Sequence, residues 1–348
     1  MKMIKLKSRL ILNSAGDKTI EVELIGDNGK RVIASVPSGI STGKYEKPNV
    51  AAEKACQEIE QIIYPKVSTT DFTQDKLDKT LEHLNCGANS TLAVSIAFSK
   101  ANNSLTISAD IKMPKMMVLL FEGGKHGNNN IKIQEFMTIV NSIDDGVQIY
   151  KKIKEELLKR NLSICVGAEG GFSPPGISDE EVLKIIAQYT NKIALDIANA
   201  HAKLSTSEIE NFLNHYPIVS IEDPIDEENW SEWENFGKKW SSKLLIAADD
   251  LTVTNPKLIE KGADLGAFNA VIIKPNQQGT VTAALKAVEM AQKHSLKVIV
   301  SHRGAETNED FIADFALAVA ADFVKFGAPC RGERAAKYNR LLGARATN

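Results

Sequence analysis

Ile218-Val219-Ser220-Ile221-Glu222 is a short apolar run that ends in an acidic residue. The runs before and after it have the same pattern and are Ile193-Ala194-Leu195-Asp196 and Leu244-Leu245-Ile246-Ala247-Ala248-Asp249. Nearly continuous apolar strands are typical of a parallel sheet that is buried on both faces. We therefore interpret the three runs as neighbouring parallel strands with an acid at each carboxyl end.

Ionisable residues occur at or just after strand-like runs, at nearly even steps, through the last two-thirds of the chain. They are Glu135, Glu169, Asp196, Glu222, Asp249, Lys274, His302 and Lys325. After a first gap of 34 residues the steps are 27, 26, 27, 25, 28 and 23 residues, enough for one strand, one helix and two short loops. Such alternation predicts a closed (β/α)₈ barrel, whose active site lies at the carboxyl ends of the strands. A ring of carboxylates, lysines and a histidine at that end predicts a catalytic site for an anionic substrate held by metal.

The composition is that of a soluble globular enzyme. The chain has 348 residues, of which 43% are hydrophobic and 25% charged, and this length exceeds one average domain. A net charge of −2 gives no basic surface for nucleic acid. We expect no membrane span, no signal peptide and a cytoplasmic location, because no sufficiently long apolar run occurs. The four cysteines form no CxxC pair, so we expect free thiols rather than a zinc site.

The first 110 residues follow a different pattern. An alternating strand over residues 19–25 and a returning strand over residues 31–37 predict a β-hairpin. Apolar spacing predicts helices over residues 51–63 and 88–105. We therefore expect an N-terminal α+β cap domain and a C-terminal barrel domain, with bounds at residues 1–110 and 111–348.

Several blocks of the sequence resemble those of enolases. They are VPSGISTG at residues 36–43, GANS at 87–90, GGKH at 123–126, IQEFM at 133–137, EGGF at 169–172, SIEDP at 220–224, DDL at 249–251, VTNP at 253–256, SHR at 301–303, GAPCRGER at 327–334 and AKYN at 336–339. The resemblance implies an enolase-type barrel, whose first strands depart from strict β/α alternation, preceded by a small α+β domain. It also implies the glycolytic, Mg²⁺-dependent dehydration of 2-phosphoglycerate to phosphoenolpyruvate, with two Mg²⁺ in each site.

The resemblance also implies roles for individual residues. Asp196, Glu222 and Asp249 match the ligands of the first Mg²⁺, and Ser41 matches the residue that helps to hold the second one over the substrate. Lys274 matches the general base and Glu169 the general acid. The other matching catalytic positions are Glu135, His126, His302 and Lys325, and the substrate-binding positions are Gln134, Arg303, Gly304 and Ser41.

The implied chemistry sets requirements on charge. Removing a proton next to a carboxylate builds a second negative charge, which Mg²⁺ ions stabilise. A Lys or His base with one or two Mg²⁺ is the known arrangement of enolase-superfamily sites. Lys274 must be neutral to act, and we expect nearby cations, including Lys325, to lower its pKa. Glu169 must be protonated, and we expect burial beside Glu135 to favour that form.

Departures from the enolase pattern leave the substrate open. Gly304 stands where a Ser that donates to the phosphate is usual, Ala168 replaces an Asp, and Lys44 replaces part of an acidic continuation. The alternative is an enzyme with the same machinery that is re-tasked to a related substrate, such as the carboxyphosphonoenolpyruvate-forming step of phosphonate biosynthesis. A non-catalytic binding protein is a third reading, disfavoured because every ionisable group is retained. Enolases are homodimers, so we expect a homodimer, although residues 15–18 differ in a region that the family uses for that contact.

Overall fold

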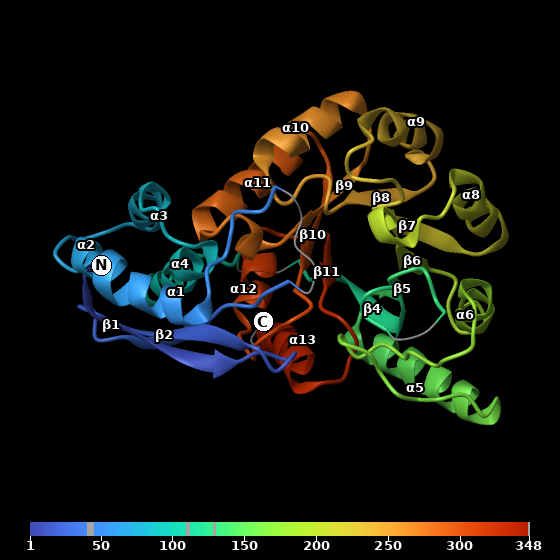
Figure 1. Ribbon diagram of the computed structural model, residues 1–348, viewed down its shortest axis with the longest axis horizontal. Helices are drawn as coiled ribbons and strands as arrows, with labels where there is room; N and C mark the ends of the chain where they lie inside the picture. The colour runs from blue at the N-terminus through green and yellow to red at the C-terminus, as the bar shows by residue number, and fades with distance from the viewer. Residues whose placement is uncertain (40–44, 109–111, 128–129, 347–348) are drawn as a thin grey trace.

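The computed structural model describes residues 1–39, 45–108, 112–127 and 130–346 (Figure 1). A small sheet covered by helices forms the N-terminal part, and a barrel surrounded by helices forms the rest. Among the described residues, each helix is either too short or too polar to cross a lipid bilayer.

The N-terminal sheet has three antiparallel strands in the order β1-β2-β3. They are β1 (Met3–Leu12), β2 (Lys18–Gly26) and β3 (Arg31–Ser35). The hairpin of β2 and β3 confirms the prediction, and alternation along β2 buries Ile20, Val22 and Leu24. Strand β1 was not predicted, because its basic residues obscure the apolar pattern. In the sheet these residues find acids on β2, as in the pair of Arg9 with Glu21.

Helices cover one face of this sheet (Figure 1). They are α1 (Ala52–Glu58), the π-helix η1 (Ile59–Ile63), α2 (Tyr64–Val67), α3 (Gln74–His83) and α4 (Ala88–Asn102). The helix predicted over residues 51–63 therefore contains a π turn and continues to Val67. The helix predicted over residues 88–105 ends at Asn102, because Asn103 takes a left-handed conformation with φ of 49°.

Eight strands close the barrel. They are β4 (Lys115–Glu122), β5 (Glu135–Val140), β6 (Ile193–Asp196), β7 (Ile218–Glu222), β8 (Leu245–Ala248), β9 (Ala270–Ile273), β10 (Lys297–Ser301) and β11 (Phe323–Lys325). The order is β10-β11-β4-β5-β6-β7-β8-β9, and β5 runs antiparallel to both its neighbours. The predicted barrel is confirmed, and so is the departure of its first strands from strict alternation.

The helices that follow the strands surround the barrel (Figure 1). They are α5 (Ile143–Lys159), α6 (Asp179–Ile186), α7 (Asn199–Ala202), α8 (Thr206–His215), α9 (Trp230–Trp240), α10 (Pro256–Leu265), the 3₁₀ turn η2 (Pro275–Gln277), α11 (Val281–Lys293), α12 (Phe311–Ala318) and α13 (Gly332–Ala346). Ser178 and Ser205 begin α6 and α8 with capping boxes, which satisfy the free amides of the first turn.

The evenly spaced ionisable residues do not each lie at the carboxyl end of a strand. Because β5 is antiparallel, Glu135 begins its strand, yet its side chain still reaches the end of the barrel where β6 and β7 finish. Glu169 lies in a turn rather than on a strand. Strand β4 ends in a different buried acid, Glu122, which the spacing pattern omits.

Candidate active site

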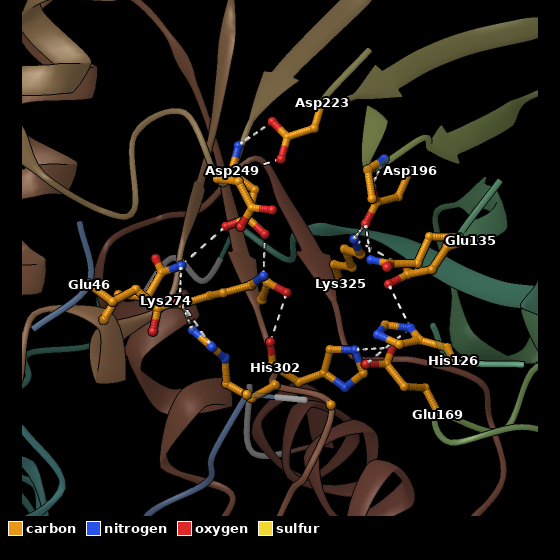
Figure 2. A pocket seen from close by; sticks show the side chains of 18 residues that line it. Glu46, His126, Glu135, Glu169, Asp196, Asp223, Asp249, Lys274, His302 and Lys325 are labelled. Carbon is orange, nitrogen blue, oxygen red and sulfur yellow. Dashed lines mark hydrogen bonds and ion pairs between the residues drawn. The ribbon is translucent and has the colours of Figure 1, made fainter. Parts of the chain in front are cut away.

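The predicted site residues meet at the carboxyl end of the barrel strands (Figure 2). One pocket is lined by His126, Gln134, Glu135, Glu169, Asp196, Asp249, Lys274, His302, Arg303, Gly304 and Lys325. Glu222 lies beside this group and contacts Lys325. Ser41 lies outside the described residues. The sequence therefore located the pocket, although the role of each residue stays a prediction.

Lys325, at the end of β11, joins three carboxylates. Its Nζ lies 2.8 Å from Glu222 Oε2, 3.0 Å from Asp196 Oδ2 and 3.2 Å from Glu135 Oε2. Burial lowers the pKa of Lys325, but the three carboxylates outweigh it, so the pKa is well above its usual range. The ammonium group therefore stays charged and holds the acids of three strands together.

Lys274 follows β9 and pairs with Asp249, which follows β8. Burial lowers the pKa of Lys274, but Asp249 and Glu222 together raise it by more, and the net direction is upward. This direction is opposite to the one expected from the sequence, because that expectation counted the neighbouring cations and not the carboxylate in contact. Gln277 Nε2 donates to Asp249 Oδ1 at 3.4 Å and so holds the same carboxylate from the other side.

Asp249 is also held through its backbone. Asp223 Oδ1 accepts from the Asp249 N–H at 3.0 Å, and Asp223 Oδ2 accepts from the Asp250 N–H at 2.8 Å. Asp223 was not singled out from the sequence, although it stands within the SIEDP block directly after Glu222. Its neighbours in space are 26 and 27 residues away, so only the fold shows this function.

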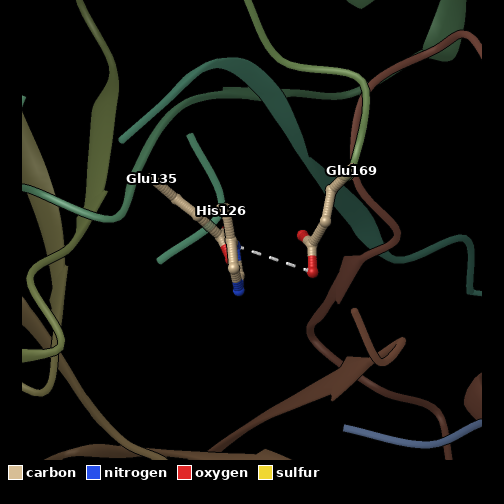
Figure 3. A group of neighbouring side chains, drawn as sticks. All are labelled: His126, Glu135 and Glu169. Carbon is tan, nitrogen blue, oxygen red and sulfur yellow. Dashed lines mark ion pairs between the residues drawn. The ribbon is translucent and has the colours of Figure 1, made fainter. Parts of the chain in front are cut away.

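The opposite side of the pocket contains Glu169, His302, His126 and Glu135. His302 Nε2 lies 3.0 Å from Glu169 Oε2. His126 Nδ1 lies 3.8 Å from Glu169 Oε1 and 3.9 Å from Glu135 Oε1. Figure 3 shows the imidazole of His126 between the two carboxylates.

The charges on this side differ from those expected. Burial raises the pKa of Glu169, but His302 and His126 outweigh it, so the pKa is well below its usual range. Burial lowers the pKa of His302 to about 4. An ionised Glu169 therefore lies beside a neutral His302 at neutral pH. The expectation that burial keeps Glu169 protonated is wrong for this state, because the imidazoles were not included in it.

Arg303 follows β10 and lies against an acid from the N-terminal part of the chain. Both of its Nη nitrogens lie 3.1 Å from Glu46 Oε1. The sequence did not single out Glu46 as a site residue. These two residues are 257 positions apart, and no local pattern connects them.

Helix α13 holds the loop that carries Arg303. Arg334 is buried and donates from Nη1 to the Arg303 carbonyl at 2.8 Å and from Nη2 to the Gly304 carbonyl at 2.6 Å. Its Nη2 also lies 3.4 Å from the Ala168 carbonyl. Arg334 therefore braces both the turn that carries Glu169 and the loop that carries Arg303, through carbonyl groups.

Asp196, Glu222 and Asp249 have the chemistry of a Mg²⁺ site. Each supplies carboxylate oxygens, the ligand type that Mg²⁺ prefers, from a neighbouring strand end. Among the described residues, the buried Glu222 Oε1 has no hydrogen-bond partner. An unpaired buried carboxylate oxygen is costly unless a cation or donor meets it. The donor chemistry of these three residues therefore suits a divalent cation. In this structure Lys325 contacts Asp196 and Glu222, and Lys274 contacts Asp249.

Comparisons with known proteins decide the family. Residues 3–108 match the family model described as "Enolase, N-terminal domain", and residues 110–205 and 196–346 match the one described as "Enolase, C-terminal TIM barrel domain". The chain belongs to the enolase family.

Two curated enolases show how far the sequence of this chain differs from those of other family members. The chain is 34% identical to the enolase of Natranaerobius thermophilus over 406 aligned positions, which cover 98% of this chain and 95% of the relative. It is 33% identical to the enolase of Kineococcus radiotolerans, with coverage of 96% and 92%. Because 406 aligned positions exceed the 348 residues of this chain, it lacks segments that the first of these enolases has.

Proposed function

We propose that this chain catalyses the Mg²⁺-dependent dehydration of 2-phosphoglycerate to phosphoenolpyruvate and water. The observation that carries the proposal is that Lys274 and Glu169 line one pocket together with Asp196, Asp249 and Arg303 (Figure 2). Family membership supports an enolase-type lyase, and the geometry supports the assignment of the two proton-transfer groups.

Lys274 is the base in this proposal. Its Nζ removes the proton from the carbon next to the substrate carboxylate, for which Lys274 must first lose its own proton. The Asp249 carboxylate now holds that proton in place. Asp249 is also one of the three residues that would hold Mg²⁺. An Asp249 carboxylate bound to the ion would attract the Lys274 ammonium group less strongly. The bound ion would supply electrostatic stabilisation of the charge that develops on the substrate carboxylate.

Glu169 is the acid in this proposal. The hydroxyl on the next carbon leaves as water when Glu169 donates a proton to it, and the electron pair of the broken C–H bond forms the double bond. Glu169 needs a proton before each turnover, since it is ionised in the substrate-free pocket. Burial raises the pKa of Glu135 well above its usual range. Between the two acids, His126 Nδ1 lies 3.9 Å from Glu135 Oε1 and 3.8 Å from Glu169 Oε1.

Arg303 binds the substrate phosphate in this proposal. Gly304 offers no hydroxyl group, and its carbonyl is already held by Arg334. Arg303 therefore contributes a larger share of phosphate binding than it would beside a hydroxyl donor. A guanidinium group suits this task because its planar fork matches a phosphate.

The proposal is tested by following the ultraviolet absorbance of phosphoenolpyruvate formed from 2-phosphoglycerate, with Mg²⁺ and with EDTA. We expect turnover with Mg²⁺ and none with EDTA. Absence of turnover from folded, Mg²⁺-binding protein would overturn the proposal. Such a result would direct the search to related anionic substrates, phosphonates included.

We also propose that the chain forms a homodimer. Strands β1 and β3 expose apolar side chains at Leu10, Leu12 and Ile33, which a second subunit would cover. Light scattering after size-exclusion chromatography measures the mass directly, and a monomer mass of 38.0 kDa at micromolar concentration would contradict this proposal.

A further inference from the structure

Glu122, the last residue of β4, is a buried acid directly behind the turn that carries Glu169. Its side chain has no exposure to solvent. Oε2 accepts from the Glu169 N–H at 3.0 Å, and Oε1 lies 3.3 Å from the same nitrogen. The side chain of one acid therefore holds the backbone of the other.

A bulge in β4 turns Glu122 toward the active site. The pairing of β4 with β5 shifts register between Leu119 and Phe121. Leu119 faces the barrel interior, so simple alternation would also place Phe121 there and would direct Glu122 outward. The extra residue reverses this order, and Glu122 pairs directly opposite Glu135, which lines the pocket. Bulges commonly redirect side chains next to active sites.

The turn at residues 167–171 is shaped around the Glu122 carboxyl group. A β-carbon on Gly167 would lie 2.6 Å from the Glu122 carboxyl carbon, so a larger residue there would displace one of the two. The Glu122 N–H donates to the Phe172 carbonyl at 3.1 Å, and the Phe172 N–H donates to the Leu120 carbonyl at 2.8 Å. Backbone and side chain of β4 therefore hold the same turn. Ala168 has no side-chain oxygen that could take over this contact.

Burial and a neighbouring acid decide the charge of Glu122. Burial raises the pKa of Glu122 to about 8, and Glu169 adds to this effect, whereas Arg334 and the N–H groups of Glu169 and Gly171 oppose it. In the part of the chain that the structure describes, Tyr150 and Cys330 also face Glu122. Glu122 is therefore neutral at pH 7 and becomes negative only at alkaline pH.

We propose that Glu122 is a positioning residue for Glu169, which fixes the turn at residues 167–171 by accepting from the Glu169 N–H. The part that concerns turnover rests on the proposed function, whereas the positioning of Glu169 itself does not. An acid whose own backbone N–H is held in this way keeps its side chain aimed at the pocket, where a proton donor must lie close to the leaving hydroxyl group.

Glu122→Gln tests this proposal, because glutamine has nearly the same shape but replaces one of the two oxygens that face the Glu169 N–H with an NH₂ group. Glu58→Gln is the matched control. Glu58 is a buried glutamate in the N-terminal part, and its Oε2 accepts from the Gly87 N–H at 2.9 Å and from Ser90 Oγ at 2.6 Å. Both substitutions weaken a buried contact between a carboxylate and a backbone N–H, but only one of them lies behind Glu169.

The first readout needs no substrate. Amide hydrogen exchange, followed by NMR, gives the protection of the Glu169 N–H. In Glu122→Gln we expect this amide to exchange at least about tenfold faster. Glu58→Gln should leave its exchange unchanged. If the Glu169 amide exchanges in Glu122→Gln as in the unchanged protein, the proposal is wrong.

The second readout separates the two proton transfers. Exchange of the substrate α-proton with deuterated solvent reports the base, and formation of phosphoenolpyruvate reports the acid as well. Glu122→Gln should slow dehydration about tenfold more than α-proton exchange, because only the acid depends on the turn that Glu122 holds. Failure of the unchanged protein to perform either reaction would overturn the proposed function, while the NMR result would still decide the position of Glu122.

Discussion

Arg303 and Glu46 form an ion pair inside the pocket that we assign to an anionic substrate. The two Nη nitrogens lie 3.1 Å from the same carboxylate oxygen, and the side chains are only 5% and 7% exposed. Gln277 Nε2 also lies 3.4 Å from Glu46 Oε1. A carboxylate of the protein therefore occupies the guanidinium group that a substrate phosphate would use, and the two anions must compete for it.

Glu46→Gln should strengthen the binding of simple anions. The variant keeps the size of the side chain and removes its charge, so phosphate no longer has to displace an ion pair. We expect about tenfold tighter binding of inorganic phosphate, which corresponds to about 1.4 kcal/mol. Isothermal titration calorimetry measures this affinity directly.

Glu309→Gln is the control for Glu46→Gln. Glu309 forms a comparable pair with Lys100 at 2.8 Å, and neither residue lines the pocket of Arg303 and Lys274. Its affinity for phosphate should remain unchanged. Weaker phosphate binding by Glu46→Gln would contradict the competition and would show instead that Glu46 orients Arg303 for the substrate.

Lys274→Ala and Glu169→Gln should affect different steps of the same reaction. Removal of the base should abolish α-proton exchange, whereas removal of the acid should spare exchange and reduce dehydration. General acid–base groups contribute about 100- to 10,000-fold, and we expect losses in that range. Lys293→Ala, at a surface lysine paired with Glu260, should retain full activity. Equal loss of exchange in both site variants would refute the division of roles.

Much of the architecture follows from local patterns, and the exceptions have physical causes. The apolar runs of β6 to β10 are buried on both faces, so their composition alone identifies them. Helix α3 was missed because it has only two buried apolar residues, Leu77 and Leu81. The direction of β5 depends on its pairing with β4 and β6, and the residues of β5 alone do not indicate it.

The contents of the pocket were more predictable than its charges. The blocks that resemble enolases contain most of the lining residues that were singled out, whereas Asp196, Lys274 and Lys325 were found at the ends of strand-like apolar runs. Charge states depend on neighbours distant in sequence, as Lys274 shows through its contact with Asp249. Glu46 and Glu122 were missed for the same reason, since each acts on a partner on another element.

Asp249→Asn should weaken the binding of Mg²⁺. The substitution removes one of three negative charges from the proposed ligand set while keeping the shape of the side chain. Changes to groups that only support a metal ligand cost about 10- to 100-fold in affinity, so loss of a ligand charge should cost at least about 100-fold. Calorimetric titration with MgCl₂ checks this, with the surface variant Asp264→Asn as control. Unaltered affinity in Asp249→Asn would exclude Asp249 from the ligand set.

Glu122 should make the stability of the fold depend on pH. Its pKa is raised from 4.5 to about 8 in the folded chain, so the folded state favours the protonated form. The corresponding stability is fully present below the unfolded pKa and is lost as pH rises toward 8. Glu122→Gln removes this loss. The free energy of unfolding, measured with urea, should therefore rise in the variant relative to the unchanged protein as the pH increases. We expect this relative rise to reach up to a few kcal/mol between about pH 5 and about pH 9. A constant difference across this range would contradict it.

Lys337 and Glu306 form a buried ion pair beneath the loop of Arg303. Their Nζ and Oε2 atoms are 3.0 Å apart, and Glu306 Oε1 accepts from the Arg303 N–H at 3.0 Å. Burial raises the pKa of Glu306, but Lys337 and Arg334 outweigh it, so the pKa lies below its usual range. The pair therefore stabilises the fold above the unfolded pKa of glutamate, and this contribution is lost as pH falls through the lower folded value.

Lys337→Met should leave Glu306 buried without its ammonium partner. Breaking a buried pair in this way costs about 3–5 kcal/mol, which urea unfolding near neutral pH should show. The loss should be smaller near pH 4, because Glu306 then becomes neutral by protonation. Arg340→Met is the control, since Arg340 lies on the same helix and pairs with Asp314 at the surface, where such pairs contribute about 0–1 kcal/mol. Equal losses in the two variants would show that Lys337 does not compensate a buried charge beneath Arg303.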